Sequence, residues 1–328
     1  MSDGPTHGGR LAAARRMFPG APGPFLDLST GINPHSYPLP RLPDAALTRL
    51  PDPEDVAALE AIAARAYGVA DPALVVAAPG TQALIQVLPL LFAQPSIAVL
   101  GPTYAEHAAT WRRAGAAVRD AADLADLAAV SAAVLCNPNN PDGRCWPAEA
   151  VLAAAPGGLL VVDEAFADLE DPGLSIASYL PRPGVVVLRS FGKTYGLAGL
   201  RLGFALAAPA EAAALRAALG PWAVSGPAIA AGCAALADTA WRERMRARLA
   251  GEAAALDEML TAAGLRVIGG TRLFRLAAHD EAAALFDRLG RAGILVRRFA
   301  DRPGWLRFGL PGTPEAGARL RAALRNPS

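Results

Sequence analysis

The basic residue with the most distinctive chemistry in this 328-residue chain is Lys193, because every other residue among the 31 lysines and arginines is an arginine. A deprotonated amine forms an imine with an aldehyde, whereas a guanidinium group does not. Lys193 is therefore a candidate for covalent chemistry. A surface lysine retained by chance fits the composition equally well.

Other candidate residues directly follow short apolar runs. Asp163 follows Leu159–Val162, and Ser190 and Lys193 follow Val185–Arg189. Ligands of open α/β sheets bind beyond the carboxyl ends of the strands, so these side chains are expected at one edge of a sheet. A carboxylate there needs a cationic partner, for which an arginine and a protonated pyridine nitrogen are both suitable.

Two segments have residues suited to a phosphate. Gly80 and Thr81 lie between an apolar run and a helical stretch, where backbone N–H groups and the helix dipole attract anions, although an ordinary βα turn looks the same. Ser190 and Arg201 flank a Gly-rich stretch, and the guanidinium can hold a phosphate through two hydrogen bonds. The chain lacks both GxxxxGK[ST] and a GxGxxG in the first βα unit, which excludes P-loop and Rossmann interpretations.

The elements that position these residues alternate between strands and helices over the first two thirds of the chain. Short continuous apolar runs of this kind indicate a mostly parallel sheet that is covered on both faces. The predicted strands are 74–78, 96–100, 132–136, 159–162, 185–189 and 202–207.

The rest of the chain is predicted to be helical from Pro209 to about Ala263, and then α+β with four strands and two helices. We therefore predict three parts. Residues 1–40 form an arm that packs with the small domain, and 41–208 form a large α/β domain. Residues 209–328 form linking helices and the small α+β domain.

The composition excludes several classes of protein. A net charge of +1 from 31 basic and 30 acidic residues argues against nucleic-acid binding. Three cysteines without a CxxC pair, and scattered histidines, predict neither disulfides nor a metal site. The absence of a signal peptide and of an apolar run of about 18 residues predicts a soluble cytoplasmic protein without membrane contact.

The order of these motifs resembles the class I/II aminotransferase group of fold-type-I pyridoxal-phosphate enzymes. The resemblance covers most of the chain and rests on segments that occur in the family's order: Gly80-Thr81, Tyr104, N-P-x-N-P-x-G at 137–143, D-E-A-F at 163–166, S-x-x-K at 190–193 and Arg201. It implies the fold-type-I architecture, with a large domain built on a mostly parallel sheet and a smaller α+β domain. It also implies a homodimer.

The resemblance also implies residue roles. Lys193 carries pyridoxal 5′-phosphate as a Schiff base, and Asp163 keeps the pyridine nitrogen protonated so that the ring accepts electrons. Asn140 donates a hydrogen bond to the O3′ oxygen, and Tyr104 stacks on the ring. The remaining cofactor-binding candidates are Gly80, Thr81, Gln82, Ser190 and Arg201.

Two residues depart from the family pattern. Phe166 stands where many relatives have a tyrosine, which removes a phenol from the O3′ hydrogen bonds. Leu50 precedes Pro51-Asp52-Pro53, where relatives often have a tyrosine that reaches the phosphate in the partner subunit. A leucine cannot donate that hydrogen bond.

The N-terminal segments His7-Gly8-Gly9 and Asp27–Pro34 resemble the L-threonine-O-3-phosphate decarboxylases of cobalamin biosynthesis. This resemblance implies a small phosphorylated amino acid as the substrate. Two alternatives stay open: an aminotransferase for histidinol phosphate or a similar amino acid, and a non-catalytic pyridoxal-binding regulator. The candidate substrate-binding residues are His7, Gly31, Asn33, Arg297 and Arg307.

Overall fold

The computed structural model describes residues 8–325, which divide into two compact units. The larger unit contains residues 36–140 and 144–244, and the smaller unit contains the rest of the described chain. Residues 209–244 belong to the larger unit, whereas the sequence pattern groups them with the small domain. The reason is packing, since the helices of this segment contact strands and helices of the larger unit.

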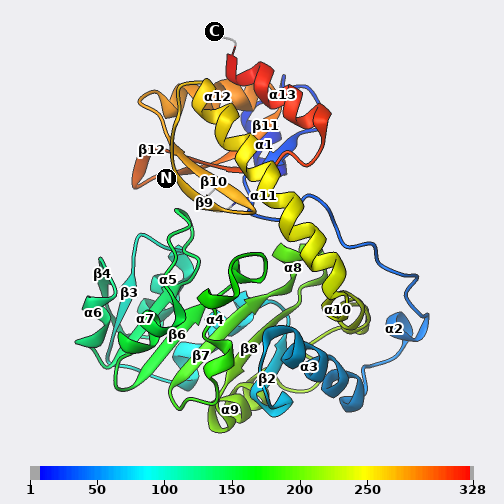
Figure 1. Ribbon diagram of the computed structural model, residues 1–328, viewed down its shortest axis with the longest axis vertical. Helices are drawn as coiled ribbons and strands as arrows, with labels where there is room; N and C mark the ends of the chain where they lie inside the picture. Colours follow the sequence, from blue (N-terminus) through cyan, green and yellow to red (C-terminus); the bar gives the residue numbers. More distant parts are fainter. Residues whose placement is uncertain (1–7, 326–328) are drawn as a thin grey trace. The chain divides into compact units, whose positions relative to one another are not determined.

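The larger unit is built on a seven-stranded sheet (Figure 1). Only β8 runs against the other strands, because it pairs antiparallel with both β2 and β7. The order across the sheet is β2 (Val75–Ala78), β8 (Gly203–Ala207), β7 (Val185–Ser190), β6 (Leu159–Asp163), β5 (Ala132–Cys136), β3 (Ser96–Leu100) and β4 (Ala117–Ala121).

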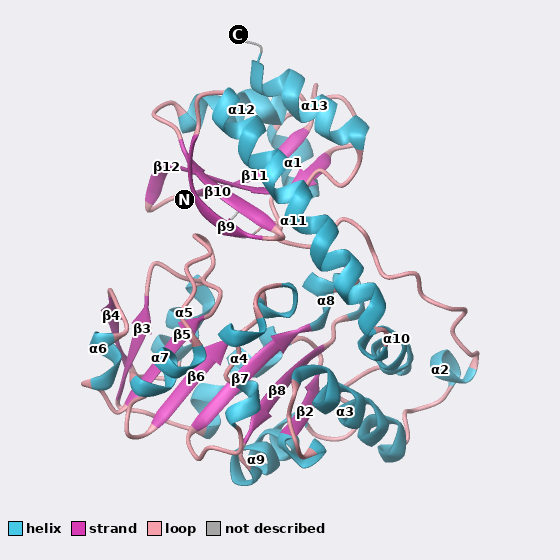
Figure 2. Cartoon of the chain, in the orientation of Figure 1, coloured by secondary structure: helices cyan, strands magenta, loops and turns pink. Residues whose placement is uncertain are grey.

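Helices lie on both faces of this sheet (Figure 2). Every residue of β5, β6, β7 and β8 is buried. On one face, Leu88, Trp111 and Leu215 join strand residues in the main apolar cluster. The helices of this unit are α2 (Ala45–Thr48), α3 (Pro53–Tyr67), α4 (Thr81–Leu91), α5 (Ala105–Arg113), α6 (Ala125–Ala128), α7 (Ala148–Ala153), α8 (Phe191–Thr194), α9 (Pro209–Leu219) and α10 (Gly226–Ala237).

The smaller unit has a five-stranded sheet with α12 (Ala282–Arg291) packed on β11 and β12. The strand order is β1 (Leu26–Leu28), β11 (Ile294–Phe299), β12 (Arg302–Gly309), β10 (Phe274–Ala278) and β9 (Arg266–Thr271). The other helices are α1 (Leu11–Met17) and α13 (Pro314–Arg325), and α11 (Thr239–Ala262) begins in the larger unit and ends here.

The N-terminal segment is part of this smaller unit. Strand β1 pairs parallel with β11, and Phe18 packs against Phe286 of α12 with ring centroids 6.0 Å apart. Within residues 8–325, no helix is both long enough and apolar enough to cross a membrane.

Candidate active site

Three predicted site residues lie at the carboxyl ends of neighbouring central strands in the larger unit. Asp163 is the last residue of β6, Ser190 is the last residue of β7, and Lys193 lies in the short helix α8 that follows. Strands β6 and β7 are parallel neighbours, and Asp163 is in register with Leu188. The topology therefore brings the carboxylate and the lysine segment to one edge of the sheet.

The carboxylate of Asp163 is buried and held on both oxygens. Its Oδ1 accepts a hydrogen bond from the backbone N–H of Ala165 at 3.0 Å, and its Oδ2 lies 2.9 Å from Nε2 of His107. Burial lowers the pKa of His107, but Cys136 and Asp163 outweigh it and raise that pKa to about 10. These interactions favour the protonated form of His107, and its contact with Oδ2 holds Asp163 in one orientation.

The role of His107 was not predicted from the sequence, where the histidines look structural or surface-exposed. Its side chain is 1% exposed and lies three residues after Tyr104, with the two rings edge to face at 5.9 Å. That i, i+3 spacing across the first turn of α5 is the signal by which it could have been found.

Lys193 lies beside an aromatic ring. Its Nζ is 5.2 Å from the ring centroid of Phe166, which is itself buried. The departure from tyrosine at position 166 thus places an apolar ring, with no hydroxyl group, next to the amine. A phenyl ring face attracts an ammonium group, but it has no hydroxyl oxygen to accept a hydrogen bond from it.

A turn with the geometry suited to an anion forms where Gly80 caps α4. Gly80 has a φ of 84°, and a Cβ atom at this position would lie 2.6 Å from Nη2 of Arg201. The guanidinium of Arg201 therefore lies against the amino terminus of an eleven-residue helix that begins with Thr81. Helix N–H groups and a guanidinium together suit a phosphate dianion.

Gln82 and Tyr104 are bonded to each other. The hydroxyl of Tyr104 donates to Oε1 of Gln82 at 3.0 Å, and Nε2 of Gln82 donates to Glu106 at 3.3 Å. These bonds fix the orientation of the tyrosine ring, so Gln82 supports the predicted stacking residue.

The loop after β5 uses two of its three asparagines to hold its own shape. Asn137 bonds to the backbone of Trp146 and Leu174, and Asn139 bonds to Thr103 and to the carbonyl of Pro102. Asn140, the predicted O3′ donor, is the partly exposed member of the three.

The described substrate-binding candidates belong to the smaller unit. Arg297 of β11 and Arg307 of β12 are register partners, and Arg307 donates to the carbonyl of Ser29 at 2.9 Å. Burial, and then the charge of Arg297, lower the pKa of Arg307. Two neighbouring guanidinium groups, one of them buried, are typical of an anion site.

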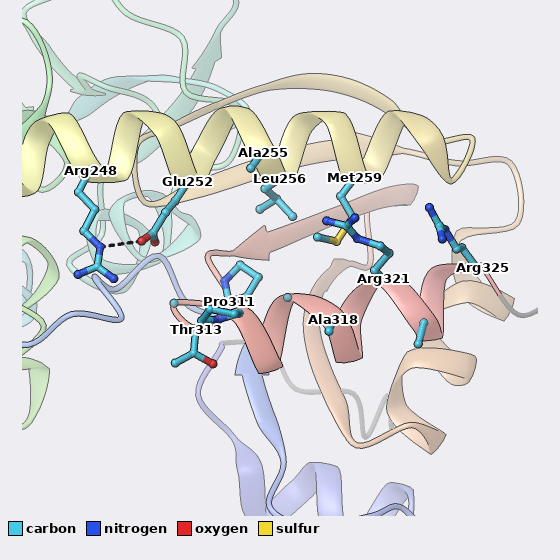
Figure 3. A pocket seen from close by; sticks show the side chains of 14 residues that line it. Arg248, Glu252, Ala255, Leu256, Met259, Pro311, Thr313, Ala318, Arg321 and Arg325 are labelled. Atoms are coloured by element: carbon cyan, nitrogen blue, oxygen red, sulfur yellow. Dashed lines mark hydrogen bonds and ion pairs between the residues drawn. The ribbon is translucent and has the colours of Figure 1, made fainter.

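Gly31 and Asn33 lie in the segment after β1, where both are buried and Oδ1 of Asn33 accepts from the backbone N–H of His35. His7 lies outside the described residues. An apolar groove of about 670 Å³ between α11 and α13 (Figure 3) has none of the predicted site residues in its lining.

The larger unit fits pyridoxal 5′-phosphate: a single lysine follows β7, a fixed carboxylate ends β6, and a guanidinium lies at the start of α4. The fold and site define a fold-type-I pyridoxal-phosphate enzyme. The chain belongs to the aminotransferase class I and II family, whose model matches residues 36–324.

Two relatives extend over nearly the whole chain. A threonine-phosphate decarboxylase from a Sinorhizobium species is 45% identical and covers 99% of this chain and 98% of its own length. The threonine-phosphate decarboxylase of Pseudomonas aeruginosa is 44% identical, with coverage of 97% and 96%. A histidinol-phosphate aminotransferase from Thermobifida fusca is 34% identical over 90% of this chain and 88% of its own.

Solved structures show the same fold. The histidinol-phosphate aminotransferase of Sinorhizobium meliloti, in complex with pyridoxal-5′-phosphate, has a TM-score of 0.80 at 25% identity and covers 95% of this chain and 92% of its own. The L-threonine-O-3-phosphate decarboxylase of Porphyromonas gingivalis has a TM-score of 0.75 at 21% identity, covering 90% and 97%. Pyridoxal 5′-phosphate is therefore the cofactor of this chain.

Proposed function

We propose that this chain is a carboxy-lyase that converts L-threonine O-3-phosphate to (R)-1-aminopropan-2-ol O-2-phosphate in cobalamin biosynthesis. The observation that carries the proposal is the identity of 45% and 44%, over 99% and 97% of the chain, with two threonine-phosphate decarboxylases. The histidinol-phosphate aminotransferase of Thermobifida fusca reaches only 34% over 90%.

In this proposal the larger unit holds the cofactor, which when bound supplies an electron sink for the pair released at Cα. Lys193 is its covalent attachment, and Asp163, backed by the His107 cation, pairs with the ring nitrogen. Tyr104 stacks on the ring, with its hydroxyl held by Gln82. Gly80, Thr81, Ser190 and Arg201 bind the phosphate group, and Asn140 donates to O3′.

Whether carbon dioxide or a proton would leave depends on how the protein's residues orient the substituents of the substrate's Cα. The substrate phosphate and carboxylate are the only anionic groups by which that orientation can be set. Arg297 and Arg307 are the proposed anion-binding pair, since an anion offsets the cost of two adjacent guanidinium groups. Gly31, Asn33 and His7 are proposed to complete the substrate contacts.

Carbon dioxide leaves when the bond from Cα to the carboxyl carbon breaks, and one proton must then reach Cα. Lys193 Nζ is the proposed donor. Phe166 beside it has no hydroxyl with which to compete for that proton. The aromatic ring is thus compatible with decarboxylation, in which the only proton to be delivered goes to Cα.

The decisive experiment incubates the purified, cofactor-loaded enzyme with L-threonine O-3-phosphate and no keto acid. We expect stoichiometric carbon dioxide and an amine product, and loss of both in Lys193→Ala. A requirement for 2-oxoglutarate, with turnover of histidinol phosphate, would instead establish the aminotransferase alternative. Binding of pyridoxal phosphate without turnover of either substrate would indicate a regulator.

We further propose that the enzyme is a homodimer located in the cytoplasm. Large apolar side chains on the larger unit support the dimer, since Leu47, Leu50 and Trp222 are 69%, 64% and 59% exposed. The three cysteines are free thiols, as is usual in a reducing compartment. Light scattering that gives the mass of one chain, or recovery outside the cytosolic fraction, would contradict these two proposals.

A further inference from the structure

A buried ion cluster lies next to the cofactor carboxylate in the larger unit. Nη1 of Arg189 is 2.5 Å from Oε2 of Glu164 and donates to Oγ of Ser175 at 3.0 Å, while Nη2 donates to Asp168. The ring of Tyr67 lies on the guanidinium, 4.5 Å from its central carbon. Arg189 is 5% exposed and Glu164 is fully buried.

The two partners sit beside cofactor residues. Glu164 directly follows Asp163 at the end of β6, and Arg189 directly precedes Ser190 in β7. Their ion pair therefore joins the end of β6, which carries Asp163, to the end of β7, which leads to Lys193. None of the motifs predicted from the sequence includes Arg189.

Glu164 is fixed at every polar group. Its Oε1 accepts from the backbone N–H of Ile176 at 2.8 Å, its Oε2 accepts from Ser175 at 2.6 Å, and its backbone N–H donates to the carbonyl of Leu188 at 2.9 Å. The next backbone N–H, that of Ala165, is the donor to Oδ1 of Asp163. The position of Glu164 thus determines the position of a donor that orients the cofactor carboxylate.

The charges of the cluster do not balance, because two carboxylates share one guanidinium. Burial raises the pKa of Glu164, and Arg189 opposes that effect. Burial lowers the pKa of Arg189, but Asp168 and Glu164 outweigh it, so that the pKa rises overall. Desolvation makes a buried pair of this kind a poor source of net stability, and its fixed geometry is its main benefit.

We propose that Glu164, locked by Arg189, is a positioning residue that aims the Asp163 carboxylate at the ring nitrogen of pyridoxal phosphate. The inference concerns the bound cofactor and not the substrate. It can therefore fail while the decarboxylase proposal stands, and it can hold if the enzyme is an aminotransferase.

The test compares Glu164→Gln with Asp168→Asn. Both substitutions remove one carboxylate charge from the same guanidinium at nearly constant volume. Only position 164 is connected, through Ala165, to Asp163. The readouts are the unfolding temperature, the dissociation constant of pyridoxal phosphate, and the pH midpoint of the absorbance change of the bound cofactor.

We expect both variants to lower the unfolding temperature. Glu164→Gln should also move the absorbance midpoint by about half a pH unit or more and weaken cofactor binding severalfold, because the charge facing the ring nitrogen is displaced. Asp168→Asn should leave the midpoint at its wild-type value.

Equal midpoint shifts in the two variants, or an unchanged midpoint in Glu164→Gln, would overturn the proposal. Should Glu164→Gln fail to fold, Arg189→Lys takes its place, since it keeps the charge and loses the two-pronged geometry. A shifted midpoint in that variant supports positioning, and a wild-type midpoint with reduced stability refutes it.

Discussion

At the scale of residues, the proposed phosphate-binding turn depends most clearly on Gly80. Its φ is 84°, and a Cβ atom added to it would come within 2.6 Å of Nη2 of Arg201, which leaves no room for a side chain. We expect Gly80→Ala to displace the guanidinium and to weaken binding of pyridoxal phosphate by about tenfold or more, since a charge-assisted pair contributes roughly 1.5–3 kcal/mol.

Gly199→Ala is the matched control for this prediction. A Cβ atom at Gly199 meets nothing within 4 Å, and the residue lies in the short 3-10 helix Ala198–Leu200, which ends at Arg201. Cofactor titration by fluorescence measures both variants. If Gly80→Ala binds the cofactor as tightly as Gly199→Ala, the guanidinium does not hold the phosphate.

The placement of a residue could be predicted where its type has few alternative uses. The lone lysine and the carboxylate after an apolar run are such cases, and the structure places both at neighbouring strand ends. Residue type alone does not single out His107 or Arg189. Their contacts are with partners on other elements, and although the spacing from Tyr104 points to His107, nothing in a single sequence pairs it with Asp163 or pairs Arg189 with Glu164.

At the scale of elements, strands with a continuous apolar run could be predicted, whereas an exposed polar strand and a very short strand could not. Strands β5, β6 and β7 are continuous apolar runs because helices cover both faces of the sheet. Strand β4 lies at the sheet edge, is mostly exposed and includes Arg119 and Asp120, so it has no apolar run to detect. Strand β1 has only three residues.

In the smaller unit, helix α11 contacts the segment after β1 that contains Asn33, a proposed substrate-binding residue. The two carboxylate oxygens of Glu252 in α11 lie 2.8 and 2.9 Å from Nε2 of His35. Arg248 donates to the same carboxylate (Figure 3). His35 in turn donates its backbone N–H to Asn33. Helix α11 therefore holds the segment that contains a proposed substrate contact.

We expect Glu252→Gln to lower stability by no more than about 1 kcal/mol, because the pair is partly exposed. The Michaelis constant for threonine phosphate should rise severalfold with little change in kcat, since Asn33 is held less firmly. Arg248→Gln removes the more exposed partner of the same carboxylate and should leave the Michaelis constant unchanged. Equal effects of the two substitutions would contradict this link.

At the scale of the whole molecule, the raised pKa of the buried His107 predicts that stability depends on pH. Its folded pKa of about 10 lies above the ordinary value of 6.5, so protonation favours the folded state. This contribution is complete below about pH 6.5 and is lost as the pH rises to about 10. The change has a limiting slope of about 1.4 kcal/mol per pH unit.

His107→Gln should therefore be destabilised most at about pH 6, and the difference from the wild type should shrink toward about pH 10. Chemical unfolding of both proteins with saturating cofactor, repeated across that range, measures the difference. A gap that stays constant with pH would show that His107 is neutral in the folded enzyme.

The division of the chain was the least predictable feature at this scale. A continuous helix, α11, begins in the larger unit and ends in the smaller one, so no Gly- or Pro-rich linker marks the division at residues 244 and 245. Local composition reports turns and apolar faces, whereas unit membership depends on which helix packs on which strand.

The reversed strand β8 has an evolutionary consequence. Because β8 pairs antiparallel with β7, residues 190–203 carry the proposed attachment lysine, a serine and an arginine in one stretch between two paired strands, with Gly203 packed against Thr81. Exchange of gene segments that preserves this stretch and the turn at Gly80 would transmit the proposed cofactor contacts as a module. The paired arginines of β11 and β12, which are proposed substrate contacts, belong to a separate unit, so substitutions there would leave that stretch unchanged.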